Sequence, residues 1–147
     1  MIYLGVIAGL LKGTRVRRAA VLAAALFALA MGPAWAAGPG DAAAGERVFN
    51  KCRPCHQIGE GARNSVGPVL NGVIGRHSGI VPDYNFSDAN KQSGLVWDEA
   101  TFRDYIKDPR GKVPGTKMTF SGLTRERDVD DILAYLKQFG PDGKKLP

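Results

Sequence analysis

Cysteine and histidine are scarce in this sequence. Only two cysteines, Cys52 and Cys55, and two histidines, His56 and His77, occur among its 147 residues. Two cysteines this close together are a poor candidate for the long-loop disulfides that stabilise many small exported proteins. A zinc site with four ligands is also disfavoured, because His77 is the only further cysteine or histidine that could complete it.

Acidic residues are absent from the first 36 positions. This segment carries four basic residues, an apolar run of 12 residues from Ala19 to Ala30, and the small-residue sequence Ala34-Trp35-Ala36. The order is typical of a secretory signal peptide, and the run is shorter than the ~20 residues that span a bilayer. We therefore expect cleavage after Ala36, export, and a mature domain of residues 37–147. The apolar segment 1–11 indicates either an unusually long leader or a start assigned too far upstream.

A strong net charge is absent from the expected mature domain. Four of the 20 lysines and arginines lie in the first 36 residues, so 16 remain against 14 acidic residues, a net charge of +2. The charge of +6 for the whole chain therefore overstates the basic character of the domain. We expect no nucleic-acid partner.

Strand-like alternation and internal repeats are also absent from residues 37–147, whereas helix signals are present. Four short helices are expected to begin at the capping residues Asp41, Ser87, Asp98 and Thr124 and to end near Cys52, Lys91, Asp108 and Gly140. In the last helix, apolar residues follow the spacing i, i+3, i+4, i+7, namely Val129, Ile132, Leu133 and Leu136. The stretches 57–85 and 111–122 are predicted to be loops. A large apolar cofactor would complete the small core that such an all-α chain provides.

The segment Cys52-Arg53-Pro54-Cys55-His56 is a C-x-x-C-H motif, which is typical of c-type haem attachment. Its spacing suits the chemistry, because two thiols can add to two vinyl groups at one porphyrin edge while the next residue brings an imidazole to the iron. A thioredoxin-like dithiol is the main alternative, but it requires a strand–helix–strand context that this sequence lacks. The motif therefore predicts one covalent haem c with His56 bound to iron.

Candidates for a second iron ligand are few, because the strong protein ligands of haem are His, Met, Cys and Tyr. Met118 is the only methionine after residue 36, and it lies in the proline- and glycine-containing segment 114–120. Methionine is more often core filler than a ligand, although its position in a loop favours the ligand. His77, next to Arg76, is expected to be a solvated surface residue.

Residues 41–140 resemble mitochondrial cytochrome c and the bacterial cytochromes c2. Besides the C-x-x-C-H motif, the resemblance rests on the order and spacing of Gly45, Phe49, Gly67-Pro68, Gly75-Arg76, Ser87 to Lys91, Trp97, Pro114 to Met118 and Ile132 to Lys137. It implies the class I cytochrome c fold, which is all-α with short helices and long loops wrapped around one covalently bound haem.

The resemblance also implies roles for the residues nearest the iron. Cys52 and Cys55 would form the thioether bonds, and His56 and Met118 would be the axial ligands. The carbonyl of Pro68 would accept a hydrogen bond from the ring of His56, which fixes its orientation and raises its basicity.

Further roles implied by the resemblance concern the surroundings of the haem. Tyr105 would place its hydroxyl near the sulfur of Met118. The other implied cofactor-binding residues are Arg76 and Trp97 at a buried propionate, Asn90 in a polar network with water, and Thr116. The helices at the two ends of the domain would cross closely at Gly45, with Phe49 and Tyr135 packed beside the crossing.

One position departs from the family pattern. Phe86 stands where many members have a tyrosine that donates a hydrogen bond to a propionate, and phenylalanine has no such donor. The neighbouring Tyr84 is a candidate to compensate. The substitution is expected to affect the propionate pKa and the reduction potential.

Two strong axial ligands leave no iron position for oxygen or substrate, so the resemblance implies a monomeric one-electron carrier without catalytic residues. Its implied partners are a cytochrome bc1-type donor and a terminal oxidase or photosynthetic reaction centre as acceptor. The alternatives are a haem peroxidase or gas-binding protein with a labile sixth ligand, and a dithiol protein without haem.

Charge gives a weaker indication of where partners bind. A basic face around the haem edge, including Lys51, Arg110 and Lys117, would dock on acidic surfaces and speed the encounter. Three aspartates of the last predicted helix would make the charge distribution asymmetric; these are Asp128, Asp130 and Asp131.

Overall fold

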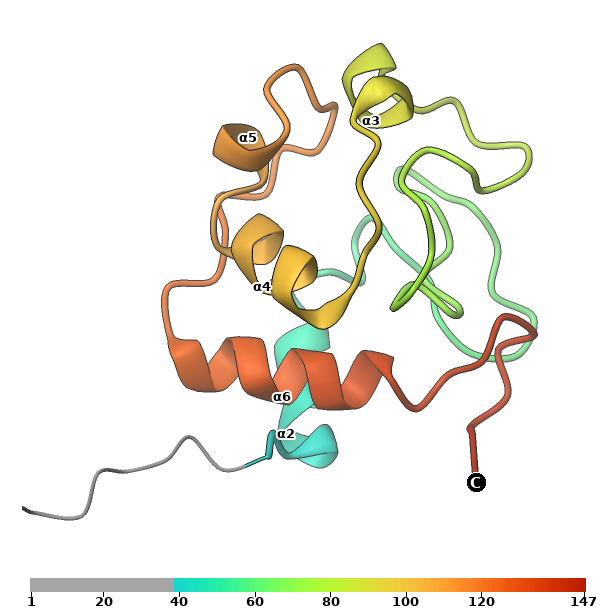
Figure 1. The fold of residues 1–147 in the computed structure, drawn as a ribbon. Coiled ribbons are helices and arrows are strands. Elements are labelled where there is room, and N and C mark those ends of the chain that lie inside the picture. Colours follow the sequence, from blue (N-terminus) through green and yellow to red (C-terminus); the bar gives the residue numbers. More distant parts are fainter. Residues whose placement is uncertain (1–38) are drawn as a thin grey trace, which may run out of the picture. The chain divides into compact units, whose positions relative to one another are not determined.

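The computed structural model describes residues 39–147, so the expected signal peptide lies outside the described residues. Within this range the helices are α2 (Ala42–Phe49), α3 (Asp88–Gln92), α4 (Glu99–Lys107), α5 (Pro109–Lys112) and α6 (Glu126–Leu136). Figure 1 shows α2 crossing behind α6, with α4 and α5 above them and α3 farther away, among the loops. The only strand-type pairings in the described residues are two isolated bridges. None of the helices described is long and apolar enough to cross a membrane.

The first three predicted helices begin where their capping residues indicate. Asp41 accepts hydrogen bonds from the backbone N–H groups of residues 43 and 44, and Ser87 and Asp98 each accept one from the residue three positions on. Side-chain oxygens at these positions satisfy N–H groups that have no partner within the helix. The observed ends, Phe49, Gln92 and Lys107, lie within three residues of those predicted.

Two features near the end of the chain differ from the sequence prediction. Thr124 does not cap α6; the residue before the helix is Arg125, whose guanidinium pairs with Asp128 in the first helical turn at 2.5 Å. The sequence also does not predict α5, which begins at Pro109, separated by one residue from the end of α4, and overlaps the first two residues of the predicted loop 111–122. Proline is suited to a first helical position because its missing N–H would have no partner there, and Asp108 accepts a hydrogen bond from Gly111 at 2.9 Å.

The crossing of α2 and α6 closes the fold around its core. A Cβ atom at Gly45 would lie 1.9 Å from the carbonyl oxygen of Asp131, so only glycine allows this approach. Beside the crossing, the rings of Phe49 and Tyr135 lie 5.3 Å apart between centroids. The predicted apolar stripe of α6 is buried, with at most 2% of each residue exposed: Val129, Ile132, Leu133 and Leu136.

The three aspartates of α6 do not form an acidic face, because each is paired with a basic side chain. Asp128 pairs with Lys51 at 3.2 Å and with Arg125. The other two pairs are Asp130 with Arg103 at 2.6 Å and Asp131 with Arg127 at 3.1 Å. All three aspartate side chains are at most 7% exposed, so their charge is balanced within the fold.

We expect Asp128→Asn to lower the free energy of unfolding at pH 7 by roughly 1–3 kcal/mol, the usual worth of hydrogen bonds to a charged group. The hydrogen bond from Arg125 lowers the pKa of Asp128 in the folded state. This contribution is therefore complete above the unfolded pKa of about 3.9 and is lost as the pH falls through the lower folded-state pKa. Denaturant unfolding at pH 7 and at about pH 3 should show the gap between wild type and variant narrowing in acid.

Asp104→Asn is the matched control, because the pair of Asp104 with Lys112 at 3.1 Å is largely exposed. Such pairs contribute about 0–1 kcal/mol. An Asp128→Asn loss that is the same at both pH values would contradict the ionic explanation.

Candidate functional site

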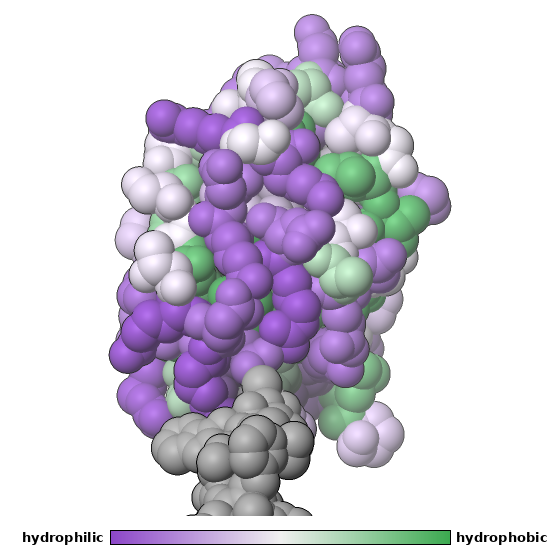
Figure 2. Space-filling model, turned by 60° about the vertical axis from the view of Figure 1, so that its left-hand side comes forward, coloured by the Kyte–Doolittle hydropathy of each residue, from purple (hydrophilic) through white to green (hydrophobic). Residues whose placement is uncertain are grey.

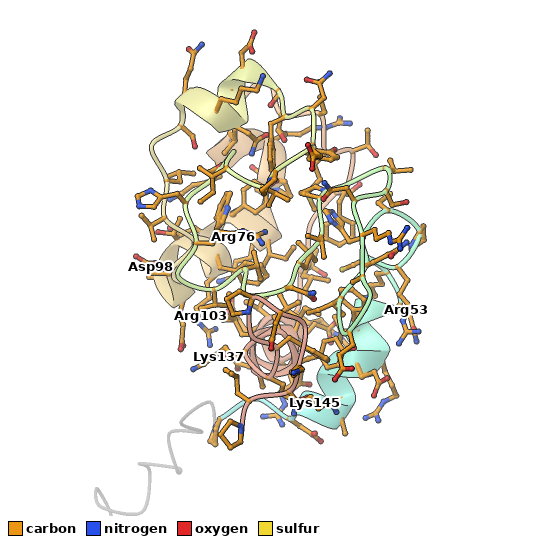
Figure 3. The ribbon with its side chains drawn as sticks, turned by 90° about the vertical axis from the view of Figure 1, so that its right-hand side faces the viewer. Arg53, Arg76, Asp98, Arg103, Lys137 and Lys145 are labelled. Carbon is orange, nitrogen blue, oxygen red and sulfur yellow. The ribbon has the colours of Figure 1, made fainter. Side chains whose placement is uncertain are left out.

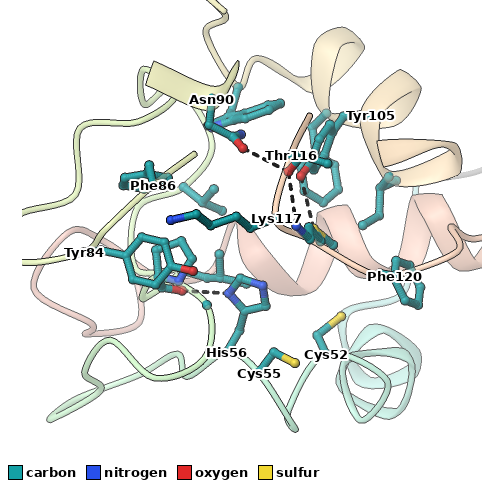
Figure 4. A pocket seen from close by; sticks show the side chains of 18 of the residues that line it. Cys52, Cys55, His56, Tyr84, Phe86, Asn90, Tyr105, Thr116, Lys117 and Phe120 are labelled. Atoms are coloured by element: carbon teal, nitrogen blue, oxygen red, sulfur yellow. Dashed lines mark hydrogen bonds between the residues drawn. The ribbon is translucent and has the colours of Figure 1, made fainter. Parts of the chain in front are cut away.

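All ten cofactor-binding residues expected from the sequence line one cavity of about 320 Å³. Figure 4 shows Cys52, Cys55 and His56 on one wall and Asn90, Tyr105 and Thr116 on the opposite wall. The remaining expected residues in its lining are Pro68, Arg76, Trp97 and Met118. The lining of the cavity is typical of a cofactor site, because apolar side chains from helices and loops surround a few polar groups.

A tight turn after α2 brings the C-x-x-C-H side chains to one wall. The N–H groups of Cys55 and His56 both donate to the carbonyl of Cys52, at 3.0 and 2.9 Å. Both cysteines are free thiols, and burial raises the pKa of Cys52 to about 11. The thioredoxin-like alternative requires a strand–helix–strand context, whereas the only strand-type pairings in residues 39–147 are two isolated bridges. Residues 39–147 also contain no group of three or more metal-binding side chains of the His, Cys, Asp or Glu type.

The ring of His56 is fixed from behind by the chain at residues 67 and 68. Nδ1 lies 2.7 Å from the carbonyl oxygen of Pro68, so it carries the proton as donor. Gly67 packs so closely that a Cβ there would lie 2.4 Å from Cε1 of the ring. Burial lowers the pKa of His56, which favours the neutral imidazole. A neutral ring with Nδ1–H bonded leaves the lone pair of Nε2 for a metal.

Met118 is held in its loop by two contacts with its neighbours. The hydroxyl of Tyr105 donates to the Met118 sulfur at 3.1 Å, and the backbone N–H of Met118 donates to Oγ1 of Thr116 at 3.3 Å. Trp97 supports this wall, with its ring 4.6 Å from that of Tyr105 between centroids. This is the position of the Tyr105 hydroxyl that the family resemblance implies.

Asn90 joins the methionine loop to the start of α3. Its Oδ1 accepts hydrogen bonds from Thr116 at 2.9 Å and from Ser87 at 2.8 Å. Ser78 donates to the backbone carbonyl of Asn90 at 3.0 Å. Sequence reasoning found Ser87 only as a helix cap and missed Ser78, because a serine in a loop carries no signal of a contact 12 residues away.

Arg76, which lines the cavity, carries a buried hydrogen-bond donor that has no partner among the described residues. Its two terminal nitrogens donate to the carbonyls of Asn71 and Val69, at 2.9 and 3.1 Å. Its Nε is the only buried side-chain nitrogen or oxygen in the described residues without a hydrogen-bond partner. Figure 3 shows Arg76 within the fold, whereas Arg53 lies at the edge of the molecule. Because a buried unpaired donor is costly, this N–H favours an anionic group, such as a carboxylate, bound in the cavity.

The donors and walls of the cavity therefore fit a haem. Two thiols lie beside a neutral imidazole that can bind iron, a thioether sulfur lies in the same cavity, and a cation with a free N–H can meet a propionate. These features come from segments far apart in the sequence, and the fold brings them to one cavity.

Phe86 lines the cavity, and Tyr84 does not replace the missing hydroxyl in this arrangement. The Tyr84 hydroxyl donates to the backbone carbonyl of Val66 at 2.7 Å. The two rings meet edge to face, with centroids 4.7 Å apart and planes at 76°. The tyrosine at residue 84 is therefore used to join two loops.

The cations of the predicted basic face differ in their surroundings. Lys51 and Lys117 line the cavity, whereas Arg110 lies exposed on α5. Lys51 pairs with Asp128, and the Lys117 ammonium donates to the carbonyl of Asn85 at 2.9 Å. Figure 2 shows one face of the domain as mostly hydrophilic, with only separate apolar patches.

Comparisons with known proteins agree with this geometry. The family model described as "Cytochrome c" matches residues 42–140. Cytochrome c2 of Rhodoplanes tepidamans is 62% identical over 103 residues, covering 70% of this chain and 96% of that protein. Cytochrome c2 of Blastochloris viridis is 57% identical over 120 residues, covering 82% and 94%. The solved structure of cytochrome cH from Methylobacterium extorquens matches with a TM-score of 0.64 and 51% identity, covering 67% of this chain and 99% of that one.

Proposed function

The chain belongs to the cytochrome c family, with the all-α class I fold, and we propose that it carries single electrons between larger redox proteins. One haem c is covalently attached in this family, and Cys52 and Cys55 are the thiols of its attachment motif. The bound haem supplies an iron that gains and loses one electron. The observation that best supports the proposal is that an imidazole and a thioether, each hydrogen-bonded to its neighbours, line the same cavity.

The proposed axial ligands are His56 and Met118. The Pro68 carbonyl holds the His56 proton on Nδ1, and the Tyr105 hydroxyl orients the Met118 sulfur. Fixed ligands need little rearrangement when the charge of the iron changes, which suits rapid electron exchange. Methionine and an apolar surrounding both favour the ferrous form and raise the reduction potential.

The proposed carrier works in the bacterial periplasm, after removal of residues 1–36. We propose a cytochrome bc1-type complex as donor and a terminal oxidase or photosynthetic reaction centre as acceptor. Lys117 and Lys51 at the cavity and Arg110 on α5 would attract acidic surfaces of these partners. Because Lys51 is already paired with Asp128, we assign it a smaller part in this attraction.

A redox titration of the purified protein with simultaneous absorption spectra tests the proposal. We expect one reversible one-electron transition, and in the ferric state the weak charge-transfer band of sulfur bound to haem iron. Carbon monoxide should not bind the ferrous protein at neutral pH. A missing band together with rapid carbon monoxide binding would instead support the peroxidase or gas-binding alternative.

A further inference from the structure

The segment 82–87, which we call the strap, contributes Tyr84, Phe86 and Ser87 to the lining of the cavity, and Figure 4 shows Tyr84 and Phe86 there. Hydrogen bonds join the strap to two other loops. On the histidine side, the Asn64 amide donates to the carbonyl of Pro82 at 2.8 Å and the Tyr84 hydroxyl donates to Val66. On the methionine side, Lys117 donates to Asn85. The strap is therefore in contact with both loops that support the proposed iron ligands.

The loop that Tyr84 contacts is the one that holds the ring of His56. Val66, Gly67 and Pro68 are consecutive, and the carbonyl of Pro68 accepts the His56 proton. The N–H of Gly67 donates to the carbonyl of Cys55 at 2.7 Å, while Gly67 itself packs against the ring. A small displacement of this backbone would therefore act directly on the imidazole.

Hydrophobic burial contributes little to holding this loop. The side chain of Val66 is 72% exposed, so its burial stabilises this loop little and hydrogen bonds must hold the loop in place. The Tyr84 hydroxyl donates to the backbone carbonyl of Val66, and the Phe86 ring meets the Tyr84 ring edge to face. Phe86 thus packs against the ring of Tyr84, and we call the Tyr84–Val66 hydrogen bond with this ring contact the clamp.

We propose that Tyr84 is a positioning residue for His56, acting through the backbone from Val66 to Pro68. The hydroxyl holds this loop against the ring and keeps the Nδ1–H hydrogen bond to Pro68 closed. The inference rests on the proposed function only in taking His56 as an iron ligand, and it requires no particular redox partner.

Hydrogen exchange in the reduced haem-bound protein, followed by nuclear magnetic resonance, tests the proposal. In Tyr84→Phe, the Nδ1–H of His56 and the N–H of Gly67 should exchange about five-fold faster, the factor that matches loss of one ordinary hydrogen bond. The Nδ1–H resonance should also move upfield as its bond to Pro68 lengthens. Phe86→Tyr is the control that keeps both rings and the clamp, so its exchange rates at both sites should match those of the wild type.

Amides of α6, such as those of Ile132 and Leu133, separate local loosening from general destabilisation. The proposal requires that their exchange stay unchanged in Tyr84→Phe. Equal acceleration at all sites, or unchanged protection of His56 and Gly67, would overturn it.

A second variant acts on the other tie between the strap and this loop. Asn64→Asp keeps the acceptor for the Val69 N–H but loses the donor to Pro82, so it should loosen the same two protons. Unchanged protection in this variant would also count against the proposal. A wild type lacking the sulfur–iron band would contradict the electron-carrier function while leaving these exchange rates interpretable.

Discussion

Met118→Ala should abolish the sulfur–iron charge-transfer band and lower the reduction potential by a sizeable part of the roughly 0.8 V range that axial ligands span. Met118 is the only methionine in residues 37–147, and alanine cannot bind iron. The variant should also bind carbon monoxide in the ferrous state, because the sixth position becomes open. Absorption spectra and a redox titration of wild type and variant measure all three effects.

Ser121→Ala is the control, because Ser121 lies three residues after Met118 in the same loop, is exposed and does not line the cavity. We expect this control to keep the band and the potential. Retention of the band in Met118→Ala would show that another group supplies the sixth ligand. Tyr105→Phe, which removes only the hydroxyl that donates to the Met118 sulfur, should keep the band with a smaller change in potential.

The features that could be predicted from the sequence are those that depend on residues close together in the chain, or on a residue type that occurs only once or twice in it. Asp41, Ser87 and Asp98 cap helices because their side chains bond N–H groups two or three residues away. The C-x-x-C-H motif is contiguous. Met118 stands out as a candidate ligand because no other methionine follows the expected leader.

The features that sequence reasoning missed depend on contacts between distant segments. The pairs that neutralise the α6 acids include Lys51, 77 residues before Asp128, and no local pattern indicates such a partner. The prediction that Thr124 caps α6 is wrong for a similar reason, because the path of the preceding chain decides which residue begins the helix. The sequence suggests Tyr84 as a substitute donor to the propionate, whereas in the fold its hydroxyl donates to the carbonyl of Val66, 18 residues away.

The double variant Cys52→Ala, Cys55→Ala should lose covalent attachment of the haem completely. Both thiols line the cavity on one turn, and they are the only cysteines in the chain. Each thioether forms when S–H adds across a vinyl C=C bond, with sulfur on one carbon and hydrogen on the other. Mass spectrometry of the denatured protein should show polypeptide plus haem for the wild type and polypeptide alone for the double variant.

Single variants and a neighbouring substitution make this test specific. Cys52→Ala or Cys55→Ala alone should each retain haem through one thioether, and Arg53→Ala, whose side chain is exposed between them, should retain it as the wild type does. In the folded double variant, His56 and Met118 can still bind iron, so native spectra should show haem that is released on unfolding. Haem that stays attached to the denatured double variant would require a covalent link outside the motif, whereas release from the denatured wild type would remove the basis for assigning Cys52 and Cys55 as attachment sites.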